Sequence, residues 1–158
     1  MDFGCGSGRD SKYFMDSGYF VKSCDGSIEM CKLASKYLNS NVICMDFLDF
    51  NEVNTYDYIW ACSSILHVED DHLLEVFNQM IDALKVGGII YTSFKVGEGY
   101  MIKEGKYYRF LTKKEMIQLL EKTGKSVRLI DYFENEPLAR RTLNSNDIWG
   151  NYIIQKYG

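Results

Sequence analysis

The chain has 158 residues, of which 46% are hydrophobic and 25% charged, and its formal net charge is −4. This size and composition are typical of a globular protein, and we expect residues 1–158 to form a single domain with a substantial core. No apolar run is long enough to span a bilayer, so we expect no membrane partner. The acidic balance and the lack of a long basic tract exclude nucleic acid as the main partner.

Strand and helix patterns alternate along the first half of the chain. Strands are predicted at residues 1–3, 19–24, 42–45 and 56–62. Helices are predicted at residues 9–17, from a cap at Ser27 to a break at 39–41, and from an acidic start at 69–71 to Leu84. Ser27 suits the start of a helix because its hydroxyl can accept a hydrogen bond from a backbone N–H of the first turn.

The second half continues with a strand, a helix and two further strands. Gly87 and Gly88 are expected to turn the chain into a strand at residues 89–94. A helix is predicted at 112–123, and strands at 127–133 and 148–155. The polar stretch 135–147, which contains Pro137, is expected to be a loop.

This order of elements predicts the fold class. Strands that alternate with helices favour right-handed crossovers and a parallel sheet with helices on both faces. The last two strands have no helix between them, so they are expected to pair antiparallel at one edge. The sequence therefore predicts an α/β fold: a doubly wound, mostly parallel Rossmann-like sheet with an antiparallel C-terminal edge hairpin.

Glycines at alternate positions, Gly4, Gly6 and Gly8, follow the first predicted strand. Glycine lets the backbone turn tightly and approach a ligand where a side chain would collide. The dinucleotide fingerprint G-x-G-x-x-G needs its third glycine one position later, where this chain has Arg9. The loop therefore predicts a nucleotide-like ligand other than a dinucleotide, with a turn that holds no ligand as the alternative.

Acidic residues follow the next two predicted strands. Asp25 stands about where an acidic residue reaches ribose hydroxyls in this layout, and helix capping is its alternative role. Asp46 can accept a hydrogen bond from an adenine amino group while Phe47 packs on the ring, and its alternative role is that of a loop acid. These residues predict an adenosine site.

Five segments in this order resemble the motifs of the class I S-adenosylmethionine-dependent methyltransferases. They are the glycine-rich segment 2–8, the acid Asp25, the pair Asp46-Phe47, the fourth-strand segment 56–62 and the segment 84–90 that leads into the fifth strand. The resemblance covers about residues 1–95. The run Gly8-Arg9-Asp10 is similar, more loosely, to a small-molecule, tellurite-resistance-like branch of these enzymes.

The resemblance implies the reaction and the cofactor site. The sulfonium methyl of S-adenosylmethionine is expected to pass to a small-molecule acceptor, which leaves S-adenosylhomocysteine. Asp2 is expected near the amino end of the methionine moiety. The cofactor-binding residues implied by the resemblance are Asp2, Gly4, Cys5, Gly6, Gly8, Asp25, Gly26, Asp46, Phe47, Ala61 and Cys62.

The acceptor side offers one candidate catalytic residue, His67, as a general base. A histidine that packs between loop and helix is the alternative, which we favour because the sequence assigns no partner acid. The acidic run 69–71 is better explained by the helix dipole than by a metal site. Segment 95–108 is expected to be either a flap over the acceptor or an exposed hairpin.

The cysteines are scattered and odd in number: Cys5, Cys24, Cys31, Cys44 and Cys62. They include no C-x-x-C pair, so the pattern favours reduced thiols over a disulfide framework or a zinc knuckle. With no secretory signal at the start, we expect a cytoplasmic protein without a bound metal.

Family members normally carry a helix and a complete first strand before the glycine loop, whereas only residues 1–3 precede it here. The resemblance therefore implies an N-terminally short domain that lacks that helix and most of the strand. We expect Asp2 to fray and the chain to be a weak enzyme or an inactive binding module. A homodimer is expected to cover the apolar surface left exposed.

Overall fold

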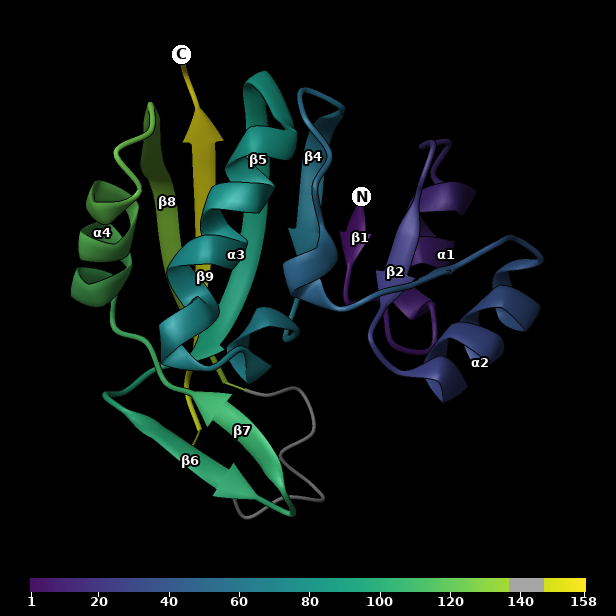
Figure 1. Cartoon of the computed structure of the whole chain (residues 1–158), viewed down its shortest axis with the longest axis horizontal. Coiled ribbons are helices and arrows are strands. Elements are labelled where there is room, and N and C mark those ends of the chain that lie inside the picture. The colour runs from purple at the N-terminus through teal and green to yellow at the C-terminus, as the bar shows by residue number, and fades with distance from the viewer. Residues whose placement is uncertain (137–146) are drawn as a thin grey trace.

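The computed structural model describes residues 1–136 and 147–158 of the chain. A seven-stranded sheet of order β3-β2-β1-β4-β5-β9-β8 forms its centre, and β6 and β7 form a separate two-stranded sheet (Figure 1). The strands are β1 (Asp2–Phe3), β2 (Ser23–Asp25), β3 (Ile43–Cys44), β4 (Tyr56–Ala61), β5 (Leu84–Lys95), β6 (Tyr100–Lys103), β7 (Lys106–Arg109), β8 (Val127–Asn135) and β9 (Trp149–Lys156).

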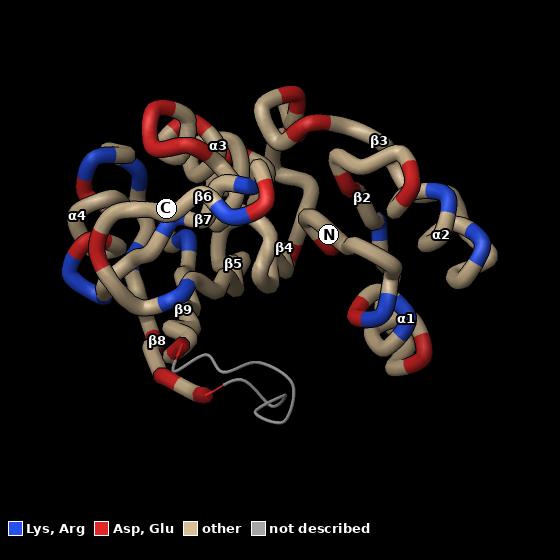
Figure 2. The backbone as a smooth tube through the Cα atoms, turned by 90° about the horizontal axis from the view of Figure 1, so that it is seen from below, with Lys and Arg blue, Asp and Glu red and all other residues tan. Residues whose placement is uncertain are grey.

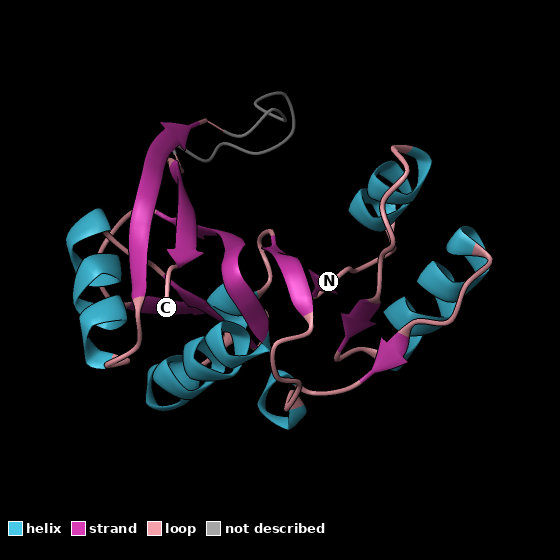
Figure 3. Ribbon diagram, turned by 90° about the horizontal axis from the view of Figure 1, so that it is seen from above, coloured by secondary structure: helices cyan, strands magenta, loops and turns pink. Residues whose placement is uncertain are grey.

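Helices lie on both faces of the central sheet, with α3 and α4 on one side and α1 and α2 on the other (Figure 3). They are α1 (Arg9–Asp16), α2 (Ile28–Leu38), α3 (Asp70–Ala83) and α4 (Lys113–Lys122), with short 3-10 helices η1 (Phe47–Asp49) and η2 (Ile65–His67). None of the helices in the described ranges is both long and apolar enough to cross a bilayer.

The pairing of the strands confirms the predicted doubly wound fold. Strands β3, β2, β1, β4 and β5 pair parallel with one another in that order. Strand β9 lies between β5 and β8 and is antiparallel to both, so the antiparallel finish is also confirmed. The order of the strands reverses between β1 and β4, and doubly wound sheets bind ligands at the carboxyl ends of the strands beside such a point.

Alternation along the strands decides which residues form the core. Phe3, Ile59, Ile90 and Tyr152 point toward α3 and are buried in one continuous cluster. The next residue along each strand therefore points to the face that carries α1. Full burial of each such side chain stabilises the fold by roughly 1.5–3 kcal/mol, so this cluster fixes the register of the central strands.

The second strand is shorter than predicted. It covers Ser23–Asp25 rather than residues 19–24, and it ends one residue later. Tyr19 and Phe20 lie outside it and are exposed. Their aromatic side chains suit a strand, but the register between β1 and β2 begins at the pair Asp2 and Ser23, so the ladder does not reach residues 19–21.

The predicted turn at Gly87 and Gly88 is wrong. Helix α3 ends at Ala83, and β5 starts at Leu84 and runs through both glycines. The register between β4 and β5 shifts in this stretch, because Tyr56 pairs with Leu84 while Tyr58 pairs with Ile89. The glycines therefore lie in an irregularity of the strand and do not precede it.

Segment 95–108 contains a hairpin. Strands β6 and β7 pair antiparallel from Tyr100 with Arg109 to Lys103 with Lys106. The hairpin lies beyond the end of β5, next to η2 (Figure 1). The predicted loop at 135–147, with Pro137, lies largely outside the described residues.

Candidate functional site

The predicted cofactor residues come from the carboxyl ends of neighbouring parallel strands. The glycine loop follows β1, Asp25 ends β2, Asp46 follows β3 and Ala61 ends β4. Because these strands are parallel and adjacent, the segments that follow them meet at one edge of the sheet. The tertiary structure thus brings together residues that are far apart in the sequence.

The three glycines of the loop all have positive φ angles, 87° at Gly4, 54° at Gly6 and 88° at Gly8. A Cβ on Gly4 would collide with the Ser64 side chain, and one on Gly8 would lie 3.2 Å from Leu38. A Cβ on Gly6 would have nothing within 4 Å. Gly4 and Gly8 are therefore required by packing inside the protein, and Gly6 is the loop glycine that faces open space.

Asp25 holds the loop and the start of α2 in place. Its Oδ2 accepts from the backbone N–H of Gly6 at 2.8 Å, and its Oδ1 accepts from that of Ser27 at 2.9 Å. The hydroxyl of Ser27 caps α2 by accepting from Met30 N at 3.3 Å. Each carboxylate oxygen has a second lone pair, so Asp25 retains acceptor capacity toward a ligand. Gly26, beside it, is exposed.

Asp46 and Phe47 lie after the end of β3. Asp46 caps η1 through Oδ1, which accepts from Leu48 N at 2.9 Å. Phe47 is half-buried, and its ring centroid lies 4.6 Å from that of Phe3. The loop role weighed for Asp46 from sequence is therefore present, while the exposed side of the residue stays open to a ligand.

Asp2 is held inside the sheet and does not fray as predicted. Its backbone N–H donates to Lys22 O at 2.8 Å, and its side chain is 3% exposed. The carboxylate accepts from the Ser11 hydroxyl of α1 at 2.5 Å, and Ser11 shares a 2.7 Å hydrogen bond with Ser23. Burial raises the pKa of Asp2 to about 6. The structure therefore places this carboxylate against α1, with the Ser11 hydroxyl as its partner.

Two thiols, those of Cys5 and Cys62, are predicted to line the cofactor site. Burial raises the pKa of Cys5 to about 12, so its thiol stays protonated at neutral pH. Cys62 is half-buried and lies 3.9 Å from the Ser93 hydroxyl. Ala61, which precedes it, is fully buried, and its carbonyl accepts from Thr92.

Sequence reasoning missed a pair of serines beside Cys62. Ser63 has a φ of 51°, a left-handed conformation that is uncommon outside glycine. Its backbone N–H donates to the Ser93 hydroxyl of β5 at 2.8 Å. Strained backbone of this kind concentrates at functional sites. No pattern in the sequence marks it, because the contact joins two different strands.

His67, the last residue of η2, packs against the hairpin. Its Nδ1 lies 2.8 Å from the carbonyl oxygen of Tyr107, and its ring meets that of Tyr108 edge-on at 4.8 Å. A carbonyl can only accept, so Nδ1 carries the proton and Nε2 presents a lone pair. Burial lowers the pKa of His67, which keeps the ring neutral at pH 7. The ring makes contacts of the kind expected for the packing role favoured from sequence, and it is also in the form that can act as a base.

Ion pairs fix the hairpin over this region. Arg109 pairs with Asp70 of α3 and with Glu115 of α4. The ammonium of Lys95 lies 2.8 Å from Asp147 and 5.3 Å from the Tyr108 ring. The aromatic content of segment 95–108 was visible in the sequence, but the position of these side chains beside His67 depends on the hairpin.

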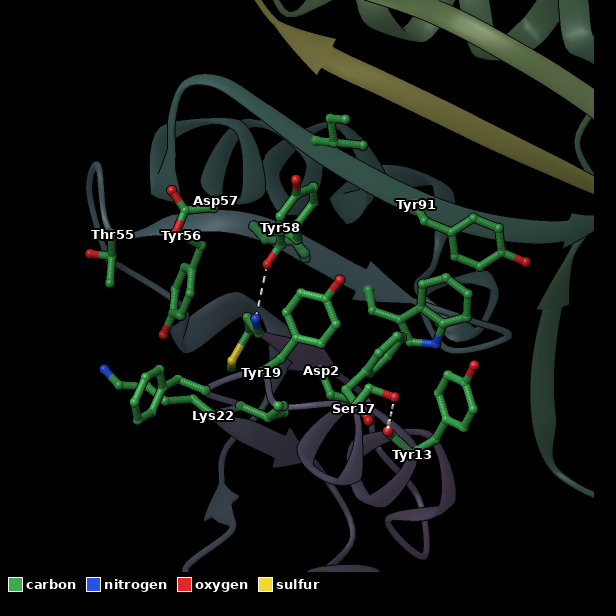
Figure 4. Close-up of a pocket in the computed structure, with 18 of the residues that line it drawn as sticks. Asp2, Tyr13, Ser17, Tyr19, Lys22, Thr55, Tyr56, Asp57, Tyr58 and Tyr91 are labelled. Atoms are coloured by element: carbon green, nitrogen blue, oxygen red, sulfur yellow. Dashed lines mark hydrogen bonds between the residues drawn. The ribbon is translucent and has the colours of Figure 1, made fainter.

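A groove of about 990 Å³ lies on the α1 face of the sheet (Figure 4). Tyr19, Tyr58, Trp60, Tyr91 and Ile153 are among the residues that line it. The Trp60 ring stacks on Tyr91 at 3.9 Å. Of the predicted cofactor residues, Asp2 alone lines this groove. The groove is therefore a separate feature from the glycine-loop edge.

No metal site accompanies these residues in the described part of the chain. Within residues 1–136 and 147–158, no group of three or more His, Cys, Asp or Glu side chains could hold a metal ion. The acidic start of α3 instead lies where carboxylates complement the helix dipole, with Asp70 and Asp71 in its first turn.

Comparisons with known proteins agree with this fold. A SAM-dependent methyltransferase from Methanosarcina mazei matches with a TM-score of 0.81 and 18% identity, over 99% of this chain and 91% of that one. A 1,6-didemethyltoxoflavin-N1-methyltransferase from Burkholderia thailandensis, with bound 1,6-didemethyltoxoflavin and S-adenosylhomocysteine, gives 0.82 and 18%, over 99% and 70% of the two chains. A cyclase gives 0.75 and 16%, over 99% and 74%. At these identities the likeness establishes the fold alone.

The family follows from the sequence. A family model described as a methyltransferase domain matches residues 1–88, more than half of the chain. No curated protein matches this chain. The chain thus has the methyltransferase fold and belongs to the methyltransferase domain family.

The buried carboxylate of Asp2 makes stability depend on pH. The folded-state pKa of about 6 lies above the ordinary value of 3.8, so the folded protein keeps a proton that the unfolded chain releases. The stability that this group supplies is complete below its unfolded pKa and is lost as pH rises through 6. We expect Asp2→Asn to be more stable than the parent at pH 7.5 by about 2 kcal/mol, and to lose this advantage near pH 4.

Denaturant unfolding at both pH values measures the difference. Asp49→Asn is the control, because Asp49 is exposed and the substitution should change stability by less than about 0.5 kcal/mol at either pH. An equal change in the Asp2→Asn protein at both pH values would show that the carboxylate charge is not the cause.

Proposed function

We propose that this protein transfers the methyl group of S-adenosylmethionine to a small-molecule acceptor and releases S-adenosylhomocysteine. The observation that carries the proposal is the open space at Gly6, next to a carboxylate that retains acceptor capacity. Membership in the methyltransferase domain family supports it. The fold alone would not, because a cyclase shares it.

The residues at the edge of the sheet fit an adenosine-bearing ligand. Gly6 leaves room for a close approach to the backbone, and the Asp25 oxygens can each accept from a ribose hydroxyl. Gly26 leaves the neighbouring surface free of a side chain. Asp46 and Phe47 hold the adenine, and Ala61 and Cys62 border the methionine end. The remaining predicted contacts are backbone atoms of the loop at Gly4, Cys5 and Gly8.

Asp2 serves the methionine end through its charge. Asp2 begins β1 and its carboxylate lies against α1, where it favours a nearby ammonium group when ionised. When bound, the cofactor supplies an activated methyl group, so the protein has mainly to position the acceptor and to remove its proton.

His67 removes that proton. The Nδ1–H donation to Tyr107 fixes the tautomer, which leaves Nε2 free to accept a proton from an acceptor hydroxyl or amine. The lowered pKa keeps His67 in the basic form over the neutral range. The edge-on contact with Tyr108 holds the ring in a single orientation.

The distribution of charge supports a small acceptor, and the free cysteines support a location in the cytoplasm. Lys and Arg are interspersed with Asp and Glu along the described chain (Figure 2), and the net charge is −4, which does not favour binding to a nucleic acid. The run Gly8-Arg9-Asp10 is similar to a small-molecule, tellurite-resistance-like branch. All five cysteines are free, as is usual for a cytoplasmic protein.

A homodimer would suit the groove on the α1 face. Phe20 is fully exposed at its rim, and Tyr19 and Tyr58 are each 59% exposed. A two-fold contact would bury these side chains in both copies at once.

Cofactor binding is tested at Gly6. We expect Gly6→Ala to weaken S-adenosylmethionine binding by about tenfold or more in titration calorimetry, because the added methyl group occupies the ligand space. Gly124→Ala is the matched control: φ is 63° there against 54° at Gly6, and neither Cβ would have a neighbour within 4 Å. Both substitutions strain the backbone by a similar amount, so a difference in affinity reports the ligand. Tighter binding of NAD than of S-adenosylmethionine would reject the cofactor.

The acceptor class is tested by a methyl-transfer screen with radiolabelled cofactor. We expect turnover on small molecules that carry a hydroxyl or amine and none on RNA, DNA or proteins, because the net charge is −4 and basic and acidic residues are interspersed along the chain. Turnover on macromolecules alone would contradict the small-molecule acceptor. Cofactor binding without turnover on any class would instead favour a non-catalytic binding module.

The role of His67 is tested by His67→Gln. We expect turnover to fall by about 100-fold while cofactor affinity stays unchanged, as is typical for loss of a general base. In the parent, kcat/KM should fall as pH drops below the lowered pKa of His67, and this acid limb should disappear in the variant. His72→Gln, at an exposed position on α3, is the control. Undiminished turnover in His67→Gln would leave His67 with a packing role only.

A further inference from the structure

Two cysteines from different elements meet between α2 and the strand β3 at the edge of the sheet. Cys31 lies in the first turn of α2, and its Sγ is 3.3 Å from the carbonyl oxygen of Asp25 and 3.9 Å from that of Ile43. Cys44 directly follows Ile43 and is paired in register with Asp25. The Cys31 sulfur thus contacts the backbone of Asp25, which pairs with Cys44, and the backbone of Ile43, which precedes Cys44.

The side chain of Cys44 points toward α2. Ile43 packs into the core on the α3 face, and successive residues of a strand point to opposite faces. Cys44 therefore faces the side on which α2 lies. Burial raises the pKa of Cys31 to about 11, and the neighbouring Cys44 thiol adds to the rise.

The two thiols differ in their access to solvent. Cys44 is exposed on the edge strand, whereas Cys31 is buried. A thiol reacts as its thiolate, so the buried Cys31 with its raised pKa is a poor first nucleophile. Cys44 is the thiol that a dissolved reagent can reach. Cys31 is placed to attack a mixed disulfide formed at Cys44.

We propose that Cys31 and Cys44 are a redox-modification site that takes a low-molecular-weight disulfide such as oxidised glutathione and controls cofactor affinity. The Cys44 thiolate attacks one sulfur of the reagent, which forms a mixed disulfide and releases one glutathione. Cys31 then attacks the Cys44 sulfur, forms the Cys31–Cys44 bond and releases the second glutathione. Two electrons pass from the cysteine pair to the reagent, and the two thiol protons leave with the two glutathione molecules.

The disulfide affects the site through Asp25. Oxidation removes the S–H group of Cys31, which donates to the Asp25 carbonyl. The carboxylate of the same residue positions the backbone N–H groups of Gly6 and Ser27. A shift of Asp25 therefore disturbs Gly6, the loop glycine at which the ligand is proposed to bind. This consequence, unlike the disulfide itself, rests on the proposed binding of S-adenosylmethionine.

The experiment treats the full chain with oxidised glutathione at pH 8 and maps its disulfides by mass spectrometry after tryptic digestion without reduction. Trypsin cuts after Lys22, Lys32, Lys36 and Lys85, so it releases Cys31 together with Cys24 in one peptide and Cys44 together with Cys62 in another. Fragmentation of the disulfide-linked peptides in the mass spectrometer then identifies the two bonded cysteines. We expect that two of the five thiols disappear and that Cys31–Cys44 is the bond found. The oxidised protein should bind S-adenosylmethionine about tenfold more weakly, equivalent to about 1.4 kcal/mol, and dithiothreitol should restore the affinity.

Two variants separate the possible outcomes. Cys44→Ser should keep its affinity for S-adenosylmethionine in oxidised glutathione, and Cys62→Ser should still form the Cys31–Cys44 disulfide.

A disulfide that links Cys5 to Cys31, or the survival of all five thiols, would overturn the site. Formation of the Cys31–Cys44 bond with unchanged affinity would overturn the control of the cofactor. Failure of the reduced protein to bind S-adenosylmethionine would reject the proposed function, and the peptide map would still decide the disulfide.

Discussion

The hydrogen bond from the Gly6 backbone to the Asp25 carboxylate joins the two segments on which the site depends. It ties the loop after β1 to the end of β2, and the second oxygen of the same carboxylate holds Ser27 at the start of α2. The loop owes its left-handed turns to glycine, and Ser64 and Leu38 fill the space around Gly4 and Gly8. A single half-buried carboxylate at a strand end therefore sets the shape of the surface offered to a ligand.

Burial of the Asp2 carboxylate lowers the stability of the folded protein. This carboxylate has been taken out of water and receives one hydroxyl donor from Ser11, which does not replace full hydration. The raised pKa measures that deficit. A charge kept in such a place is typical of functional sites, since a structural role would be served as well by a neutral side chain.

The acceptor side depends on the hairpin more than on the central sheet. Strands β6 and β7 are held by the ion pairs of Arg109 with α3 and α4, and they supply the carbonyl and the ring that orient His67. Hairpins of this kind lie outside the repeating strand–helix pattern, so they can differ between proteins that share the sheet. Within this fold, the proposed cofactor edge and the proposed acceptor side thus come from different elements.

The sequence by itself determined the fold class, the glycine loop and the candidate acids, because strand ends, caps and turns are written in local patterns of residues. It misplaced the start of β2 and the turn at Gly87, since pairing with a neighbouring strand decides where a strand begins. Only the tertiary structure assigned Gly4 and Gly8 to packing and Gly6 to open space, fixed the tautomer of His67, and brought Cys31 to Cys44. Each of these depends on contacts between segments far apart in the chain, and no local pattern encodes such contacts.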